Sequence, residues 1–587
     1  GKAASYSEVE LAFAFGRSRR GTTPLRVPRM GRSLLGGAGR LLERTARQRT
    51  IAFCGTDGRP RFMGLLASGL PKPRVVVLGS GWAGNRLARM LNKELYDVSI
   101  VSPANHFLVT PLLPQTAVGT LEARNVQENV RTIDGLHKYY QAKAVDLDVQ
   151  SQMLVCEECI TNERPNGHRF RVRFDVLVVA TGCKTDTFGT PGVVEAEGRE
   201  VHFLKHIRHA QGIRNRMLEC FERAAMPGVD PAERDRLLSF VVVGGGPTSC
   251  EFTAELHDFL ATDVSTWAYP DLAKHVTLTL VEAGPRLMPA FDAALVGHMM
   301  SQLAKRKVNV RTRTRVKALR ADEEGCTNMA VLQAEGGPEE TLRFGTLVWS
   351  AGLQQVKFVQ NLNLRGIELL KSRTGRLCTD EYMRVLYEEE DADEQPEPPL
   401  EDVEAHAQWA RDQMPKPVLR GRMYALGDCA EITTQPLPPT AQVAEQQADY
   451  LASCLNQEPF VRGLAARRDY TGLAPLPLPQ PVPPSSFPPV PSIFYRKRAG
   501  FQYINRGSMS SLGMGGGLVD MTKLNVPAPP GGDGEPAQVR GPTATGLLAF
   551  TAWHGYYFSR QYTSMNIVLN LLHSFRSRFL RRDIGRF

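Results

Sequence analysis

The sequence lacks the features that define several classes of protein. None of its 587 residues belong to a run of about 18 consecutive apolar residues, the length that a membrane-spanning helix needs. Its ten cysteines are scattered, and Cys156 and Cys159 are the only close pair, which excludes a small disulfide-built scaffold. This pair has no second pair at the spacing of a zinc site, so the sequence predicts no metal centre.

Acidic residues are scarce at the start of the chain. Residues 1–70 hold twelve Arg and one Lys against four carboxylates, a local charge of +9 out of +10 for the whole chain. An Arg-rich, acid-poor leader is typical of a mitochondrial targeting segment. A nucleic-acid-binding protein would instead spread basic residues over its folded surface, so we expect no nucleic-acid partner.

Two later segments depart from globular composition. Residues 388–404 contain ten carboxylates and no basic residue, which predicts an acidic insertion over 388–420. Residues 475–491 contain nine prolines, which predicts an extended linker over 464–492. Both segments are spacers or strips that dock a partner, and alternating strand and helix patterns fill the chain from about 73 to 455.

The first motif with chemical meaning follows a short apolar strand at 74–78. Gly79, Gly81 and Gly84 then open a helical stretch, and a second strand ends at Ser102. A strand that runs into a glycine-rich turn and a helix allows backbone N–H groups to hold a pyrophosphate. The sequence therefore predicts a dinucleotide site, although Ser102 stands where an acidic residue usually binds the ribose.

A second copy of this motif follows the strand at 239–243. Gly244 and Gly246 form the turn, Ser249 replaces the third glycine, and Glu251 lies on the first helical turn. The next strand ends at Glu282, whose carboxylate would accept hydrogen bonds from a ribose 2′-hydroxyl and repel a 2′-phosphate. We therefore expect NADH to be preferred over NADPH.

Two dinucleotide motifs in one chain predict an α/β fold with two Rossmann-like domains, one for FAD and one for a nicotinamide. A strand-like segment at 174–182 lies between the two motifs, and another at 347–352 follows the second motif. A further short strand at 423–425 leads to Gly427 and Asp428, and this carboxylate suits a ribityl hydroxyl of the flavin.

With these motifs in place, the chain resembles the type II (alternative, non-proton-pumping) NADH:quinone oxidoreductases, a family of two-dinucleotide-binding flavoproteins. The resemblance covers about 73–455 and 494–587, and its more specific marks lie at 105–114, 118–120, 439–447 and 582–587. It implies five regions after the leader, namely a first FAD-binding part at 71–240, an NADH-binding domain at 241–355, a second FAD-binding part at 356–463, the linker at 464–492, and a membrane-anchoring region at 493–587.

The resemblance also implies roles for individual residues. The FAD side would comprise Gly79, Gly81, Gly84, Ser102, Thr110, Pro111, Leu112, Leu113, Thr181, Gly182, Gly427 and Asp428. The NADH side would comprise Gly244, Gly246, Glu251, Glu282, Ala351 and Gly352, with Glu251 taking part in catalysis. Ala441, Gln442 and Gln446 match a strip that the family places at the quinone head group, where an amide can hydrogen-bond a quinone carbonyl.

Other functions stay open at this point. A sulfide:quinone oxidoreductase needs reactive cysteines beside the flavin, and Cys183 and Cys429 lie within the flavin motifs. A catalytically weak paralogue, retained as a subunit of a respiratory complex, would account for Ser249 and the insertions. A disulfide reductase is disfavoured, because no cysteine occurs between Gly84 and Cys156.

The C-terminal region predicts contact with a membrane surface. From Met565 onward, apolar residues recur at three- and four-residue steps among arginines, and residues 546–562 contain six aromatic residues. We expect a monotopic protein of the mitochondrial inner membrane, with the matrix face preferred and a homodimer as the assembly. The alternative is that these helices pack on the protein's own core or on the dimer partner.

Overall fold

The computed structural model describes residues 71–160, 167–323, 325–364, 367–388, 415–465, 500–526 and 537–585. The chain divides into the units Gly1–Gly69 and Leu70–Phe587, and all described residues belong to the second. The predicted leader, most of the acidic insertion and most of the Pro-rich linker lie outside the described residues. In the described part of the chain, no helix is long and apolar enough to cross a membrane.

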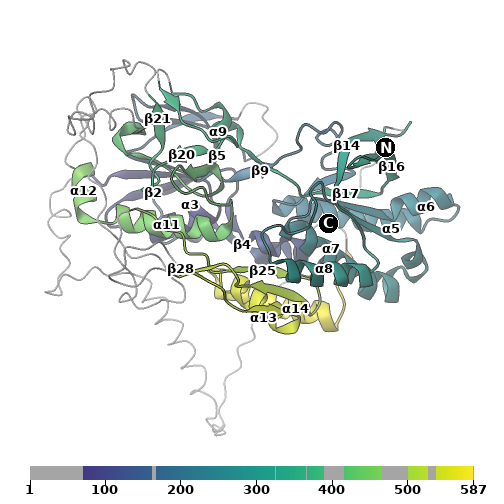
Figure 1. Ribbon diagram of the computed structural model, residues 1–587. Helices are drawn as coiled ribbons and strands as arrows, with labels where there is room; N and C mark the ends of the chain where they lie inside the picture. Colours follow the sequence, from purple (N-terminus) through teal and green to yellow (C-terminus); the bar gives the residue numbers. More distant parts are fainter. Residues whose placement is uncertain are drawn as a thin grey trace, which may run out of the picture. The chain divides into compact units, whose positions relative to one another are not determined.

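The first sheet has seven strands, and its centre is parallel (Figure 1). Its order is β23 (Met423–Ala425), β8 (Val176–Val179), β1 (Arg74–Leu78), β2 (Asp97–Ser102), β5 (Lys138–Asp148), β6 (Met153–Glu158) and β7 (Arg169–Arg173). All four residues of β8 are buried, as expected for a strand covered on both faces. The chain leaves this sheet after β8 and returns to it only at β23, which brings the segment before Asp428 next to the first glycine turn.

The second sheet has five parallel strands. Its order is β10 (Val201–Phe203), β17 (Thr346–Trp349), β11 (Ser239–Val243), β12 (Thr277–Val281) and β13 (Asn309–Arg311). The boundary expected at residue 240 therefore falls inside this unit, because β10 already belongs to it. A three-residue strand is too short to show a period in the sequence, which explains the difference.

Smaller sheets accompany these two. One antiparallel sheet contains β14 (Thr314–Ala321), β15 (Thr327–Ala334) and β16 (Glu339–Arg343), and another contains β25 (Ser508–Ser511), β26 (Gly517–Asp520) and β29 (Thr543–Thr545). The short paired strands are β3 (His106–Leu108) with β4 (Gln127–Asn129), β9 (Cys183–Thr185) with β18 (Leu353–Gln355), β20 (Leu377–Thr379) with β24 (Ala430–Ile432), β21 (Leu386–Glu388) with β19 (Glu368–Leu369) and β22 (Lys416–Pro417), and β27 (Leu524–Val526) with β28 (Ala537–Val539).

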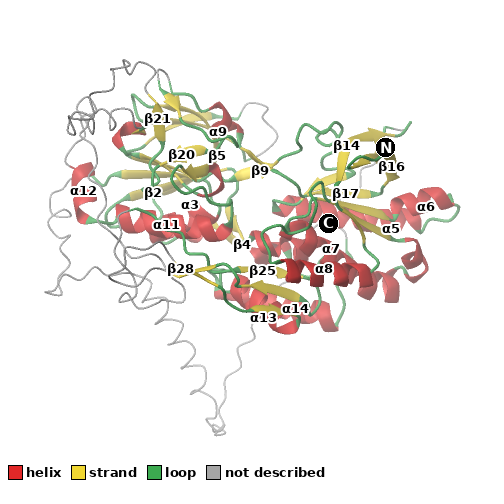
Figure 2. Cartoon of the chain, viewed as in Figure 1, coloured by secondary structure: helices red, strands yellow, loops and turns green. Residues whose placement is uncertain are grey.

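Helices flank the sheets, and two of them lie beside short strands in the C-terminal region (Figure 2). They are α3 (Trp82–Met90), α4 (Leu113–Ala117), α5 (Ile207–Ala224), α6 (Pro231–Leu237), α7 (Pro247–Phe259), α8 (Ala293–Lys305), α9 (Lys357–Asn361), α11 (Ala441–Leu455), α12 (Glu458–Ala465), α13 (Leu547–Phe558) and α14 (Ser564–Phe579). Several begin at the capping residues that the sequence supplies. The side chain of Thr440, for example, accepts a hydrogen bond from the N–H of Val443 at the start of α11.

The two C-terminal helices have different surroundings. Trp553 and Phe558 of α13 are buried in the same apolar core as residues of α5, α7 and β11, so part of the aromatic cluster expected at a membrane surface is core instead. The predicted apolar stripe of α14 is exposed, with Val568, Leu572 and Phe575 each more than half accessible. Helix α13 thus follows the alternative prediction, in which the C-terminal helices pack on the protein's own core, whereas α14 presents an apolar face at the surface.

Candidate functional site

The first glycine turn joins β1 to α3 at the carboxyl end of the seven-stranded sheet. Gly79 has a φ of +104°, and a Cβ there would lie 2.2 Å from the carbonyl oxygen of Ala180, so only glycine fits. No described atom lies within 4 Å of the Cβ position of Gly81, and α3 begins at this residue without a side-chain cap. The first N–H groups of α3 are therefore open to an anionic ligand.

A buried amide beside this turn indicates that a bound group completes the site. Asn85 on α3 is fully buried, yet neither its Nδ2 nor its Oδ1 has a hydrogen-bond partner among the described residues. Burial without a partner costs about 1–3 kcal/mol for such a group. The turn and Asn85 thus fit the pyrophosphate half of FAD. The hydroxyl of Ser102 is paired with that of Ser80 at 3.0 Å, so its role toward the ribose stays a prediction.

The residues expected around the flavin converge on this turn. The indole Nε1 of Trp82 donates to the Thr110 hydroxyl at 3.0 Å, which ties the segment 110–113 to the start of α3. Within this segment, Leu112 and Leu113 are buried and Pro111 is partly exposed. Thr181 and Gly182 follow β8 after Ala180, and the Cα of Thr181 lies 3.2 Å from the Cβ position of Gly79.

Asp428 lies next to Cys183, the residue that follows Gly182 in the sequence. The Asp428 carboxylate accepts from the Cys183 thiol at 3.1 Å, and the Lys205 ammonium lies 3.0 Å from the Cys183 sulfur and 3.8 Å from the carboxylate. Burial, followed by the charge of Asp428, raises the pKa of the Cys183 thiol to about 12. Cys183 is therefore a neutral thiol at pH 7, which is unsuited to sulfide chemistry. Burial also raises the pKa of Cys429.

The second glycine turn repeats the geometry of the first. Gly244 has a φ of +117°, α7 begins at Gly246 without a side-chain cap, and no described atom lies within 4 Å of the Gly246 Cβ position. Ser249, in place of the third glycine, bonds the Ser350 hydroxyl at 2.7 Å and so leaves the open side of the turn clear. Ala351 lies against Gly244, since the Gly244 Cβ position is 3.1 Å from its backbone nitrogen.

Glu282 lies over the second turn, as expected from its place after β12. One carboxylate oxygen accepts from the N–H of Gly284, and a Cβ on Gly245 would lie 2.7 Å from the other oxygen, Oε2. The carboxylate is thus fixed beside the glycine turn with one oxygen directed over it. Gly352 has a φ of +73°, and the exposed ring of Phe188 lies against it.

Glu251 is buried on the first turns of α7. Its Oε1 accepts from the N–H of Ser511 at 3.1 Å, and burial raises the pKa of its carboxyl to about 8. A buried carboxyl that changes its charge near neutral pH suits proton transfer. This position is consistent with the catalytic role predicted for it.

The two glutamines expected at the quinone are engaged by another part of the chain. The Gln442 Oε1 accepts from the Tyr503 hydroxyl at 2.6 Å and from the Arg506 N–H at 3.0 Å. Gln446 exchanges two hydrogen bonds with the backbone of Ile504, at 2.9 and 3.0 Å. Their amides therefore hold the segment 503–507 on α11, and contact with a quinone carbonyl would require these bonds to rearrange. Ala441, the first residue of α11, is partly exposed.

Sequence reasoning missed three polar residues of this region. Gln447 is buried and its Oε1 accepts from the N–H of Gly427 at 2.7 Å, which fixes the turn that carries Asp428. Gln115 on α4 and Glu255 on α7 are joined by a hydrogen bond of 3.2 Å between the two predicted cofactor regions. The spacing of four residues from Glu251 to Glu255 was the available signal, since it places both on one helix face.

Comparison with known proteins gives consistent findings. A model of the pyridine nucleotide-disulphide oxidoreductase family matches residues 73–389. An internal alternative NAD(P)H-ubiquinone oxidoreductase A1 of Solanum tuberosum, named as mitochondrial, is 31% identical over 88% of each chain. The external NADH-ubiquinone oxidoreductase 2 of Saccharomyces cerevisiae, also named as mitochondrial, is 34% identical over 67% of this chain and 64% of its own length. Among solved structures, NDH2 from Plasmodium falciparum in complex with NADH has a TM-score of 0.66 at 20% identity, and the match covers 88% of this chain and 100% of that one.

Proposed function

Since the chain belongs to the pyridine nucleotide-disulphide oxidoreductase family, we propose that it is a flavoenzyme that oxidises NADH and passes the electrons through FAD to ubiquinone. The observation that carries this proposal is the duplicated site. In each of the two large sheets, a parallel strand ends in a glycine turn whose helix opens without a side-chain cap, and the contact between Gln115 and Glu255 joins α4 of one region to α7 of the other. Two dinucleotides are thus accommodated in one unit.

The flavin side of the proposal rests on residues around β1, β8 and β23. The N-terminus of α3 would hold the pyrophosphate of FAD, and Asp428, fixed through the Gly427–Gln447 bond, would bind the ribityl chain. Leu112 and Leu113 would supply an apolar wall for the ring. When bound, FAD supplies the redox chemistry, and the protein positions the ring and its two reaction partners.

The nicotinamide side rests on the second turn and its neighbours. The N-terminus of α7 would hold the pyrophosphate of NADH, and Glu282 would bind a ribose hydroxyl through its free oxygen. Gly352 would border the nicotinamide. Glu251 would donate or accept a proton as the quinone is reduced, because burial holds the pKa of its carboxyl close to neutrality.

The quinone site is proposed at the junction of α11, the segment 503–507 and α13. Gln442 and Gln446 lie there, and Tyr503 adds a hydroxyl whose pKa burial raises to about 12, so that it stays protonated. The ion pair between Glu445 and Arg560, 3.2 Å apart and largely buried, fixes α11 to the end of α13. Such a junction provides both apolar walls and hydrogen-bond donors for a quinone head group.

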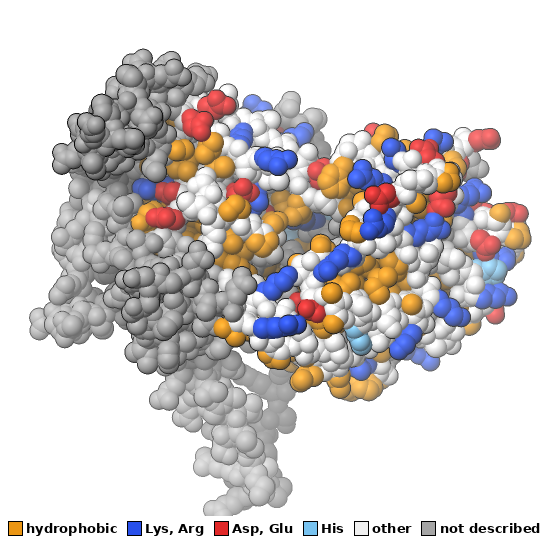
Figure 3. Space-filling model, viewed as in Figure 1, with side chains coloured by type: hydrophobic (Ala, Val, Ile, Leu, Met, Phe, Trp, Pro, Cys, Tyr) orange, Lys and Arg blue, Asp and Glu red, His pale blue; other side chains and the backbone are white. Residues whose placement is uncertain are grey.

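Contact with a membrane is proposed for α14, whose polarity is inverted relative to a core helix. Its two central asparagines face the protein, since Asn570 donates to the backbone of Asn125 at 2.9 Å and Asn566 donates to that of Gln127 at 3.1 Å. Most of its apolar residues, among them Val568, Leu572 and Phe575, are exposed, and Figure 3 shows apolar side chains gathered along the edge where Figure 1 places this helix. A helix fixed in this way presents its apolar face to lipid or to a second copy of the chain.

The relatives named as mitochondrial and the Arg-rich residues 1–70 support a mitochondrial location. Within it, we propose that the protein lies on the inner membrane, on the matrix side, as a homodimer. The acidic and Pro-rich insertions are candidate strips for association with respiratory complexes.

The test is reduction of the purified, FAD-loaded protein in anaerobic stopped flow, with NADH or sulfide as the donor and a soluble quinone as the acceptor. NADH should bleach the flavin absorbance within milliseconds to seconds, and the quinone should restore it. Sulfide should give no such bleaching, because the thiols of Cys183 and Cys429 are neutral. Rapid reduction by sulfide together with no reduction by NADH would overturn the proposal.

A further inference from the structure

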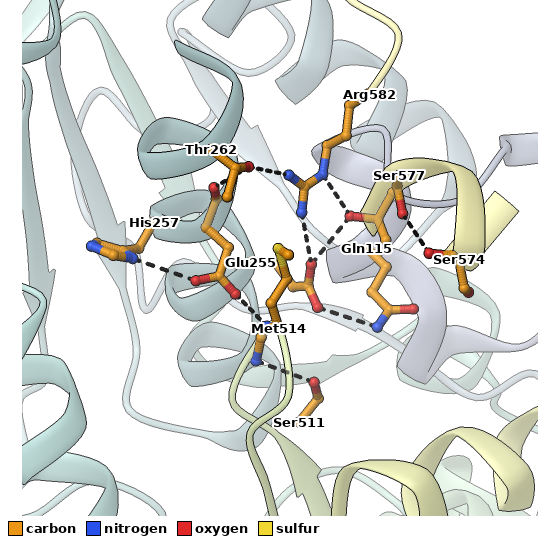
Figure 4. A network of polar contacts seen from close by, with 12 residues as sticks. Gln115, Glu255, His257, Thr262, Ser511, Met514, Ser574, Ser577 and Arg582 are labelled. Carbon is orange, nitrogen blue, oxygen red and sulfur yellow. Dashed lines mark hydrogen bonds and ion pairs between the residues drawn. The ribbon is translucent and has the colours of Figure 1, made fainter. Parts of the chain in front are cut away.

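Helix α7 carries a buried row of carboxyl groups that extends beyond Glu251. Glu251, Glu255 and Asp258 are spaced by four and three residues, so they share one helix face, and each is less than a tenth exposed. The C-terminal region covers this face, with backbone N–H groups of Ser511 and Met514 donating to Glu251 and Asp258. Figure 4 shows Glu255 within this network.

Glu255 is held by donors from three other elements. Its Oε1 accepts from the Gln115 amide and its Oε2 from the Thr120 hydroxyl, both at 3.2 Å. The guanidinium of Arg582, from the end of the chain, lies 4.0 Å from Oε2 (Figure 4). These donors and the cation fix the carboxyl group in place and favour its charged form, whereas burial favours its neutral form.

The Gln115 amide connects Glu255 to a histidine. Its Nε2 lies 2.9 Å from Nε2 of His554, whose Nδ1 lies 3.0 Å from the carbonyl oxygen of Phe550. Because Nδ1–H donates to that carbonyl, Nε2 of the neutral ring is the acceptor, and the Gln115 amide donates to His554 and Glu255 together. Burial lowers the pKa of His554 to about 4, so this histidine is neutral at pH 7.

The reaction needs a proton at this place. NADH + H⁺ + quinone gives NAD⁺ + quinol, in which the hydride brings two electrons and one proton, and the second proton comes from solvent in each turnover. Residues four apart on a helix have Cβ atoms about 5–6 Å apart, so the carboxyl groups of Glu251 and Glu255 are within reach of each other. Asp258 continues the row toward His257, whose side chain is one quarter exposed and lies 3.5 Å from the Asp258 carboxylate.

We propose that Glu255 is a proton-relay residue, which receives the solvent proton of each turnover along the α7 row and passes it to Glu251. This inference rests on the proposed function. In each step, one carboxyl O–H bond breaks and another forms, and the redox state of the protein does not change. Gln115 and Arg582 position the relay, since they fix the two oxygens of Glu255 in place.

The charge states of the row support this assignment. Burial raises the pKa of Glu251 to about 8 and that of Glu255 to about 7, so both carboxyls exchange protons near pH 7. The groups around Glu251 are Ser510, Ser511, Trp553 and Tyr557. The groups around Glu255 are Arg582, Asp258, Gln115 and Thr120. The next titratable or charged groups outward are Arg306, His257, His554 and Asp263. Of these, Arg582 lowers the pKa of Glu255 and Asp258 raises it.

The first experiment measures the two half-reactions of Glu255→Gln separately in stopped flow. Bleaching by NADH should stay within about twofold of the wild type, because hydride transfer does not use the relay. Reoxidation by quinone should slow by about 100-fold, as for the loss of an acid–base group, and added imidazole should restore part of the rate. Glu222→Gln is the matched control, since Glu222 also accepts a hydrogen bond but is exposed.

The second experiment does not use turnover. Infrared difference spectra of the FAD-loaded protein, titrated from pH 6 to pH 9 without substrate, should show buried carboxyl groups that lose their protons near pH 7 and pH 8. The lower transition should disappear in Glu255→Gln and persist in Glu222→Gln. If Glu255→Gln fails to bind FAD, Glu255→Asp replaces it, and it should keep the transition and slow reoxidation by only about tenfold.

Reoxidation at the wild-type rate in Glu255→Gln, or an unchanged infrared titration, would overturn the relay. A reoxidation defect that imidazole does not relieve would also overturn it, because a merely structural defect has that signature. If the wild type itself is not reoxidised by quinone, the proposed function fails instead, and the infrared titration still decides whether Glu255 exchanges a proton.

Discussion

The strongest structural prediction concerns Arg582, which fastens the end of the chain to the helical segment Leu260–Ala268 that continues α7. Its Nη1 donates to the Asp263 carboxylate at 2.7 Å and to the Thr262 hydroxyl at 2.9 Å, and its Nε donates to the Thr120 hydroxyl at 3.0 Å. The side chains of Arg582 and Asp263 are only 1% and 2% exposed. Arg582→Met would leave Asp263 buried without its cation.

Removal of one partner from a buried ion pair costs about 3–5 kcal/mol, since the remaining charge has lost both water and its counter-ion. At about 1.4 kcal/mol per factor of ten, local opening of the C-terminal segment should become on the order of 100- to 4,000-fold more frequent. Hydrogen exchange of the amides at 564–585 measures this directly. Heat denaturation is less suited, because a chain of this size need not unfold in one step.

Two further variants serve as controls for the Arg582 prediction. Arg581→Met is the matched control, because Arg581 is exposed and only lies over the ring of Trp267 at 5.2 Å, a contact worth about 0.5–1 kcal/mol. Arg582→Met combined with Asp263→Asn should recover much of the lost protection, since Asp263 then no longer carries the buried charge that Arg582 paired. Equal exchange rates in the Arg581 and Arg582 variants would refute the reasoning.

Three further predictions test the proposed sites. Glu282→Ser should narrow the ratio of kcat/KM for NADH over NADPH by the equivalent of about 1–3 kcal/mol, because it removes a charge-assisted hydrogen bond to the NADH ribose and the repulsion of the NADPH 2′-phosphate. An unchanged ratio would contradict the ribose role. The double variant Gln442→Leu, Gln446→Leu should still be bleached by NADH in stopped flow but be reoxidised slowly by quinone, whereas new proteolytic cleavage at 500–510 with normal reoxidation would show that the two amides serve only as a clamp. Leu572→Ser with Phe575→Ser should abolish sedimentation with anionic vesicles and preserve NADH oxidation with a soluble quinone, while a change from dimer to monomer with full vesicle binding would assign the stripe to a dimer interface.

Sequence reasoning predicted those parts of the candidate site whose geometry depends on residues that are close together in the sequence. The turns at Gly79 and Gly244 each follow a strand directly and open a helix, so their geometry is encoded within about ten residues. Glu282 is of the same kind, because it ends the next strand in a parallel sheet. In these cases the local sequence signal and the tertiary environment agree.

The remaining contacts join segments that are distant in sequence. Gln442 and Gln446 bond a segment about sixty residues later, beyond the Pro-rich linker, and no periodicity of α11 indicates this. The partners of Glu255 come from α4 and from the last residues of the chain. Pattern analysis assigns a face to each helix, but it does not identify which element covers that face.

The C-terminal region shows the same limit of sequence reasoning. How this region packs determines which change separates the proposed membrane contact from catalysis. Removal of everything from Gly546 onward is the simplest way to delete the C-terminal helices. Trp553 and Phe558 lie in the core, however, and Arg582 is bonded to the continuation of α7, so removal would open apolar core and leave buried carboxylates without their cation. The exposed stripe of α14 has no such role, because the helix is held on the protein by Asn566, Asn570 and the partly buried Ile567, which lie off that stripe. Substitution on that stripe therefore separates membrane contact from the redox site, whereas truncation would remove both together.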